Sequence, residues 1–350
     1  MSDALAPRLL AWHARHGRRD LPWQHPRSAY RVWLSEVMLQ QTQVATVVAY
    51  FQRFVKALPD LASLAAAEED QVLALWSGLG YYRRARFLHQ AARICVAQHG
   101  GCLPRDFDAL LALPGIGRST AGAILAQAFG ECHAILDGNV KRVLTRYHAV
   151  HGWPGDAAVN RRLWQLAEEH TPDQDVANYT QAIMDLGATL CTRRKPRCAD
   201  CPVMSTCLGH QQQLVDVLPT ARPRKSVPQR ETCMLILHDM EGRILLQQRD
   251  GHGVWPRLWS LPEAADPAQA SALARRFAKA PGRASALPDV HHVFSHFRLR
   301  ICPMLWRQVA SRPGVGDNAD LRWCTPEQLG SVGLPAPVRR LLESVQAAPD

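Results

Sequence analysis

Four cysteines lie close together in the second half of the chain. Cys191, Cys198, Cys201 and Cys207 follow the pattern C-x6-C-x2-C-x5-C. Four thiolates on one short loop can enclose either a zinc ion or a cubane iron–sulfur cluster. Zinc sites usually contain paired C-x2-C knuckles, and this loop has a single close pair, so the wider spacing favours the cluster. The spacing alone predicts a metal centre and leaves both metals open.

A glycine-rich turn precedes this loop. The segment LPGIGRST, residues 113–120, contains Gly115 and Gly117, which permit a tight turn between two helices. Ser119 or Thr120 can cap the second helix. Amides exposed at a helix N-terminus bind phosphate without regard to base identity. The segment therefore predicts a DNA-backbone contact, with a plain connection between helices as the alternative.

Two carboxylates have contrasting neighbourhoods. Glu36 lies among apolar residues such as Trp33 and Val37, which should raise its pKa and make it a general acid near neutral pH. Asp137 lies at the start of an expected helix, whose N-terminal field should keep its pKa low. Cleavage of a glycosidic bond uses such a pair. The alternatives are a solvated helix residue at Glu36 and an ordinary helix cap at Asp137.

The elements that position these residues divide the chain into two domains. Apolar spacing of three and four residues predicts an all-α domain over residues 1–208. A basic, proline-rich linker is expected over residues 209–229. Residues 230–347 predict an α+β domain with a hairpin turning at residues 239–242. Within it, a strand pair and a closing helix are expected at residues 291–306 and 335–345.

Composition narrows the class of protein. The chain has 350 residues, of which 47% are hydrophobic and 21% charged, so it can form packed cores and is not a disordered chain. No apolar run is long enough for a membrane span, and the first twenty residues lack the apolar region of a secretory signal. We therefore expect a cytoplasmic protein with no membrane partner. The net charge of +10 favours nucleic acid as the partner.

In this order and spacing, the motifs resemble those of the helix–hairpin–helix DNA glycosylases that carry a [4Fe–4S] cluster. SEVMLQQTQV at residues 35–44, SGLGYYRRAR at residues 77–86 and HHVFSHF at residues 291–297 are similar to the adenine DNA glycosylases of the MutY type. The resemblance extends over essentially the whole chain. It implies excision of adenine opposite 8-oxoguanine or guanine in double-stranded DNA during base excision repair, by a monomer associated with the bacterial nucleoid.

The resemblance also implies roles for single residues. Glu36 matches the catalytic acid of the family, Asp137 its catalytic aspartate, and Asn139 an asparagine near the sugar. The related bifunctional glycosylases have a nucleophilic lysine at the position of Ser119, and serine cannot form an imine. The family resemblance therefore implies a monofunctional enzyme. A bifunctional glycosylase/lyase acting on oxidised pyrimidines, and a non-catalytic metal-dependent DNA-binding protein, are the alternatives.

The matching DNA-reading residues form two groups. One group wedges into the duplex around the oxidised guanine and the other inspects that guanine from the C-terminal domain. The first group comprises Gln41, Thr42, Leu79 and Tyr81, and the second comprises His292, Phe294 and Ser295.

The C-terminal domain resembles a Nudix fold without its catalytic residues. GVWPRLWSLPE at residues 253–263 is similar to the start of a Nudix loop. Arg275 and Arg276 stand where the metal-binding glutamates of a hydrolase are expected. Hard cations need oxygen ligands, so we expect recognition of 8-oxoguanine here and no nucleotide hydrolysis.

Overall fold

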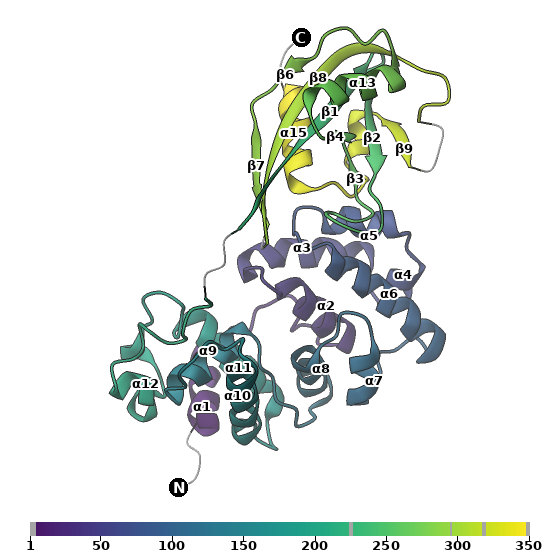
Figure 1. Ribbon diagram of the computed structural model, residues 1–350. Helices are drawn as coiled ribbons and strands as arrows, with labels where there is room; N and C mark the ends of the chain where they lie inside the picture. Colours follow the sequence, from purple (N-terminus) through teal and green to yellow (C-terminus); the bar gives the residue numbers. More distant parts are fainter. Residues whose placement is uncertain (1–4, 224–226, 295, 317–319, 348–350) are drawn as a thin grey trace. The chain divides into compact units, whose positions relative to one another are not determined.

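A computed structural model describes residues 5–223, 227–294, 296–316 and 320–347 (Figure 1). The chain forms two compact units, and each is considered by itself. One unit comprises residues 1–65 and 90–224, and the other comprises residues 66–89 and 225–350. The domain boundaries predicted at residues 208 and 229 remain predictions. Residues 66–89 belong to the unit that contains the sheet, although the sequence places them inside the helical domain.

The first unit is built from helices, as its apolar periodicity predicts. The periodicity from Val32 to Leu58 is carried by two helices, separated by a turn at residues 40–43 in which Gln41 adopts a positive φ of 58°. The helices are α1 (Leu5–His16), α2 (Ala29–Leu39), α3 (Val44–Ala57), α4 (Leu61–Ala66), α7 (Phe107–Ala112), α8 (Arg118–Ile124), the π-helix η1 (Leu125–Phe129), α9 (Gly138–Tyr147), α10 (Ala157–His170), α11 (Val176–Thr189), the 3-10 turns η2 (Cys198–Asp200) and η3 (Met204–Thr206), and α12 (Leu208–Gln211).

One core of this unit fixes the position of α9. Apolar residues of α1, α9, α10 and α11 pack into a single buried cluster. α11 approaches α9 closely at Gly187, because a Cβ there would lie 2.6 Å from the Cβ of Asn139. The start of α9, where Asp137 lies, is therefore set by close packing.

The second unit combines a mixed sheet with helices. The central strands β1 (Gln229–Asp239) and β8 (Arg298–Ser311) run parallel, and the sheet order is β3-β2-β1-β8-β5. β2 (Ile244–Gln248) pairs antiparallel with β1, which confirms the expected hairpin. β7 (Val290–Val293) pairs antiparallel with β8, which confirms the expected strand pair. Short strands complete the sheet: β3 (Trp259–Ser260), β4 (Glu263–Ala264), β5 (Ala278–Lys279), β6 (Ser285–Ala286) and β9 (Leu321–Cys324).

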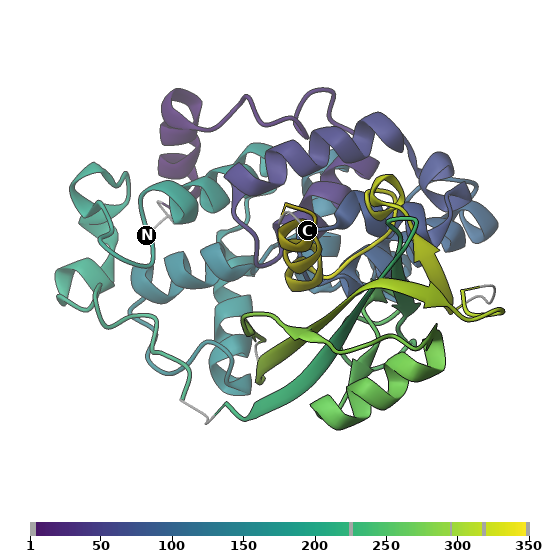
Figure 2. The same cartoon turned by 90° about the horizontal axis from the view of Figure 1, so that it is seen from above.

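Helices cover this sheet on both faces. α13 (Pro267–Phe277) packs on β1 and β8, and the expected closing helix is α15 (Ala336–Ala347), on the other side of the strands (Figure 2). α14 (Pro326–Leu329) follows β9. The segment 66–89 contributes α5 (Glu69–Trp76) and the start of α6 (Arg83–Gln98), which continues into the first unit.

Candidate active site and cysteine loop

Glu36 lies in α2 with its carboxyl group turned into a desolvated site. Ser28 caps this helix, and the neighbouring residues Trp33 and Val37 are buried. Burial, together with the negative charge of Asp137, raises the pKa of Glu36 to about 8. Gln127 Nε2 donates a hydrogen bond of 3.4 Å to Glu36 Oε1, and this bond lowers the pKa of Glu36. The raised pKa predicted from the sequence is confirmed, and the carboxyl group carries a proton at pH 7.

Asp137 is the N-cap of α9. Its Oδ1 accepts a hydrogen bond from the backbone N–H of Val140 at 2.7 Å, and its Oδ2 accepts one from Asn139 Nδ2 at 3.2 Å. Burial nevertheless raises the pKa of Asp137, against the opposing effects of these donors and of the positive charge of Arg142. The low pKa predicted from the helix terminus is wrong, because desolvation outweighs the helix-terminal field. A buried carboxylate of this kind strongly favours a positive charge beside it.

A hydrogen-bonded chain joins Asp137 to the cysteine loop. Asn139, which donates to Asp137, accepts a hydrogen bond of 2.8 Å on its Oδ1 from Arg142 Nη2. Arg142 also donates to the carbonyls of Gly187 and Cys191, each at 2.7 Å. Arg142 therefore fixes which way the Asn139 amide faces. The sequence reasoning missed Arg142, although its spacing of three residues from Asn139 on one helix places the two side chains together.

Ser119 lies near the same carboxylate. Its Oγ accepts a hydrogen bond of 3.0 Å from the backbone N–H of Leu136, the residue before Asp137. The predicted capping role of Ser119 or Thr120 is wrong: Gly117 is the N-cap of α8, with no side-chain cap, so both hydroxyl residues lie inside the helix. Gly115 forms the turn with a φ of 79°, which favours glycine.

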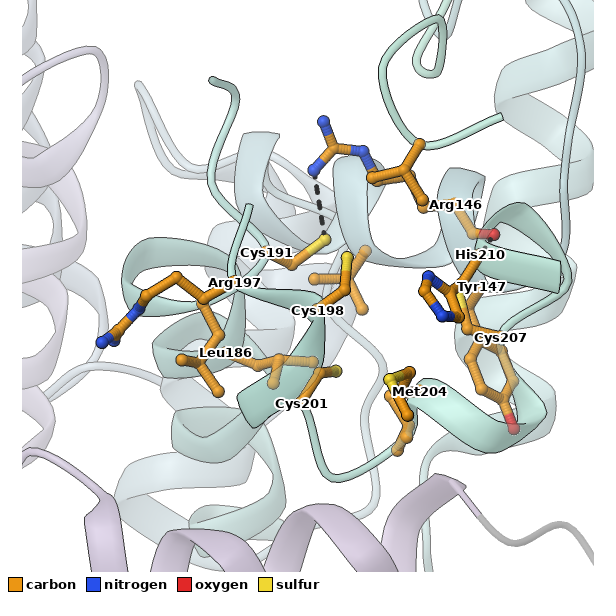
Figure 3. Close-up of a pocket in the computed structure, with 14 residues that line it drawn as sticks. Arg146, Tyr147, Leu186, Cys191, Arg197, Cys198, Cys201, Met204, Cys207 and His210 are labelled. Atoms are coloured by element: carbon orange, nitrogen blue, oxygen red, sulfur yellow. Dashed lines mark hydrogen bonds between the residues drawn. The ribbon is translucent and has the colours of Figure 1, made fainter. Parts of the chain in front are cut away.

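The four predicted cysteines line one cavity (Figure 3). Arg146 Nη1 lies 3.4 Å from Cys191 Sγ, and the Cys207 thiol donates to the Arg146 carbonyl at 3.5 Å. Burial raises the pKa of the Cys198 and Cys207 thiols, and raises that of Cys201 to about 11.

The donor set of this cavity consists of four thiols. Within the described ranges, no cluster of three or more Cys, His, Asp or Glu side chains is arranged to hold a metal ion. The walls of the cavity are apolar, with Val143 and Leu186 among them, and the Arg146 guanidinium lies beside the sulfur atom of Cys191. The chemistry of four soft donors with a cation beside them fits an anionic thiolate-ligated cluster.

The two expected wedge segments are exposed turns. Gln41 and Thr42 lie in the turn between α2 and α3. In the other unit, Tyr81 is 50% exposed with a φ of 50°, between the buried side chains of Leu79 and Tyr82. Positive φ values at two consecutive positions, Gly80 and Tyr81, give this turn its sharp bend.

The residues expected to inspect guanine form an aromatic cluster. The ring centroids of His292 and Phe294 are 4.6 Å apart in an edge-on arrangement. Trp255 lies 5.5 Å from His292 and 5.2 Å from Phe294, a third ring that the sequence reasoning missed although it stands in the Nudix-like GVWP segment. Burial lowers the pKa of His292, which favours the neutral ring. Ser295 lies outside the described residues.

Comparisons with known proteins show the family of this chain. The family model of HhH-GPD superfamily base excision DNA repair proteins matches residues 34–169, and that of the NUDIX domain matches residues 232–344. The adenine DNA glycosylase of Buchnera aphidicola subsp. Acyrthosiphon pisum (strain APS) is 35% identical over 96% of each chain. The adenine DNA glycosylase of Homo sapiens is 35% identical over 97% of this chain and 73% of its own.

Solved structures show the same helical fold. The structure of a thermostable thymine-DNA glycosylase matches 59% of this chain and 95% of its own, with a TM-score of 0.54 and 28% identity. A non-covalent endonuclease III–DNA complex matches 60% of this chain and 94% of its own, with a TM-score of 0.51 and 20% identity, and supports the fold alone.

These findings select among the functions considered. No helix in the described part of the chain has the length and apolar character needed to cross a bilayer. The full-length relatives are enzymes, which argues against a non-catalytic DNA-binding protein. The expected fold class, a helical glycosylase domain followed by a Nudix-like domain, is confirmed. The chain belongs to the adenine DNA glycosylase family of base excision repair enzymes.

Proposed function

We propose that this glycosylase hydrolyses the bond between adenine and deoxyribose in double-stranded DNA, where adenine is mispaired with 8-oxoguanine or guanine. Glu36 is the general acid and Asp137 stabilises the cationic sugar. The observation that carries this proposal is the pairing of a carboxyl group whose pKa is about 8 with a second buried carboxyl group that interacts with it.

The chemistry requires one protonated and one ionised carboxyl group. The Glu36 proton is transferred to N7 of a flipped adenine, so the base leaves as a neutral molecule when the C1′–N9 bond breaks. Ionised Asp137, held by Val140 and Asn139, stabilises the positive charge on the sugar. A water molecule then adds its oxygen to C1′ and returns a proton to Glu36, which leaves an abasic site and restores the enzyme.

Ser119 supports a monofunctional reaction. A lysine at this position would attack C1′ and form an imine, from which the strand can be cut. The Ser119 hydroxyl instead accepts a hydrogen bond from the Leu136 backbone, and it has no amine to form an imine. The expected product is an intact strand with an abasic site, which argues against a bifunctional glycosylase/lyase.

Cys191, Cys198, Cys201 and Cys207 would hold a [4Fe–4S] cluster. Their wide spacing and the Arg146 guanidinium beside Cys191 support a cluster over zinc. When bound, the cluster cross-links the loop, and hydrolysis needs no electron transfer. Arg142 donates to the Cys191 carbonyl and to Asn139, so ordering of this loop also orders the residue that donates to Asp137.

The remaining predicted residues support recognition of the mispair. The turn before α8 offers backbone amides to phosphate, and exposed Tyr81 offers an aromatic face to the stacked bases. Arg275 and Arg276 are exposed on α13, where they offer no oxygen ligand to a hard cation. The Nudix-like domain therefore recognises 8-oxoguanine and does not hydrolyse nucleotides. The proposed contacts are Gln41, Thr42, Leu79, Tyr81, Gly115, Gly117, Ser119, His292, Phe294 and Ser295.

Cleavage of an end-labelled duplex tests the proposal. With adenine opposite 8-oxoguanine or guanine, the strand should break at the adenine only after hot alkali, because an abasic site is alkali-labile. Breakage without alkali would reveal a lyase nucleophile. An intact strand in both lanes, with the duplex still bound, would refute the assigned reaction.

A further inference from the structure

Residues 66–89 are tied to the C-terminal part of the chain by specific buried contacts within one compact unit. The indole Nε1 of Trp259, a residue that is 2% exposed, donates a hydrogen bond of 3.1 Å to Asp70 Oδ2. A Cβ at Gly333 would lie 2.8 Å from the Cβ of Leu73, so the chain passes α5 at a distance only glycine allows. This segment therefore packs closely against the C-terminal residues.

The tightest set of hydrogen bonds meets at one carbonyl. The Leu334 carbonyl accepts from Tyr82 Oη at 2.8 Å and from Ser77 Oγ at 3.0 Å. Arg339 Nη2, from α15, donates to Ser77 Oγ at 3.0 Å. Leu334 is 1% exposed, Tyr82 is 5% exposed and Ser77 is 9% exposed, so these bonds are shielded from water.

These bonds enclose a short turn. Ser77 and Tyr82 are its two ends, and the Gly78 N–H donates to Tyr82 Oη at 3.2 Å, which closes the turn across its base. Between them, Gly78, Gly80 and Tyr81 all adopt positive φ values. Tyr81 is 50% exposed, and the Arg84 guanidinium lies over its ring. Positive φ is unfavourable for a tyrosine, so this conformation needs contacts that hold it.

We propose that Ser77 and Tyr82 are positioning residues through which the C-terminal domain holds Tyr81 ready for the DNA. The domain thus has a second role besides inspection of the guanine, because its Leu334 carbonyl stabilises the turn that contains Tyr81. This inference rests on the proposed contact of Tyr81 with DNA. It assigns no contact between DNA and either Ser77 or Tyr82.

The decisive variant is Tyr82→Phe, which keeps the buried ring and removes only the hydroxyl. It leaves the Gly78 N–H without its acceptor and the Leu334 carbonyl with one donor. We expect about tenfold weaker binding to a duplex with 2′-fluoroadenosine, which resists excision, opposite 8-oxoguanine. Ser77→Ala should act in the same direction. Fluorescence anisotropy measures the affinity.

Tyr30→Phe is the matched control. Tyr30 Oη also donates to a leucine carbonyl, that of Leu58, at 2.8 Å, and it is 8% exposed. It lies in α2 and forms none of the hydrogen bonds that enclose this turn, so its variant should lose stability without weakening DNA binding. Hydrogen exchange over residues 77–82 should increase in Tyr82→Phe and stay unchanged in Tyr30→Phe.

Tyr81→Ala separates the two proposals. If Tyr81→Ala binds the duplex like the wild type, the proposed DNA contact of Tyr81 is wrong. If Tyr81→Ala weakens binding and Tyr82→Phe does not, the positioning role alone is wrong. The double variant should bind like Tyr81→Ala, because Tyr82 acts through Tyr81. Fully additive losses, or equal losses in Tyr82→Phe and Tyr30→Phe, would overturn the inference.

Discussion

Replacement of Glu36 by glutamine should stabilise the folded protein at neutral pH, even though it abolishes excision. The pKa of Glu36 is raised by burial from 4.5 to about 8. Below pH 4.5 this group is protonated in both the folded and the unfolded chain. As the pH rises towards 8, the unfolded chain releases the proton and the folded chain keeps it, so stability is lost.

The magnitude follows from the two pKa values. At pH 7 the unfolded group is ionised and the folded group is protonated, which costs about 3 kcal/mol of unfolding free energy. Glutamine carries no such cost, and its carbonyl can still accept the hydrogen bond from Gln127. For a unit of this size each kcal/mol raises Tm by roughly 2–4 °C, so the variant should melt about 6–12 °C higher.

Thermal denaturation at two pH values provides the assay. The excess Tm of Glu36→Gln over the wild type should shrink at pH 5 to about a quarter of its value at pH 7, because roughly a quarter of the unfolded glutamic acid side chains are then protonated. Glu169→Gln is the control, because Glu169 is exposed on α10 and its ion pair with Arg162 contributes little. A lower Tm for Glu36→Gln at pH 7, or an excess that does not depend on pH, would refute the buried, protonated carboxyl group.

Three further predictions follow from the same contacts. The single-turnover excision rate should fall as the pH rises through about 8, where Glu36 loses its proton, and a rate that is flat up to pH 9.5 would contradict the acid role. Arg142→Ala should reduce the excision rate on the order of 100-fold, because the Asn139 amide loses its anchor; Arg162→Ala, on the exposed face of α10, should leave the rate unchanged. Cys198→Ser should lower both the iron content and the visible absorbance of the purified protein, whereas a zinc-containing, colourless wild type would exclude the cluster.

The confirmed predictions depend on local surroundings. The apolar neighbours of Glu36 on its own helix are visible in the sequence and are buried, and burial is the larger cause of its raised pKa. The four cysteines line one cavity because they share one short loop. The hairpin at residues 239–242 and the closing helix are likewise set by nearby residues.

The missed features depend on contacts between distant segments. The sequence shows that Asp137 begins a helix, but the depth of its burial depends on how α9 packs against other helices, and that burial sets its pKa. Residues 66–89 have helical periodicity, but their attachment depends on a carbonyl at Leu334, about 250 residues away, which no side-chain pattern reveals. The predicted cap of α8 is wrong because an extended Gly117, two residues before Ser119, begins the helix and leaves both hydroxyl residues inside it.

The most direct test of the central claim is single-turnover excision by the wild type, Glu36→Gln and Asp137→Asn on a duplex with adenine opposite 8-oxoguanine. Binding to the uncleavable 2′-fluoro duplex is measured in parallel. The two-carboxyl mechanism predicts that both variants bind as the wild type does and release no adenine. Excision by Glu36→Gln at the wild-type rate would contradict the acid role, and loss of binding by Asp137→Asn would make that residue a structural cap of α9.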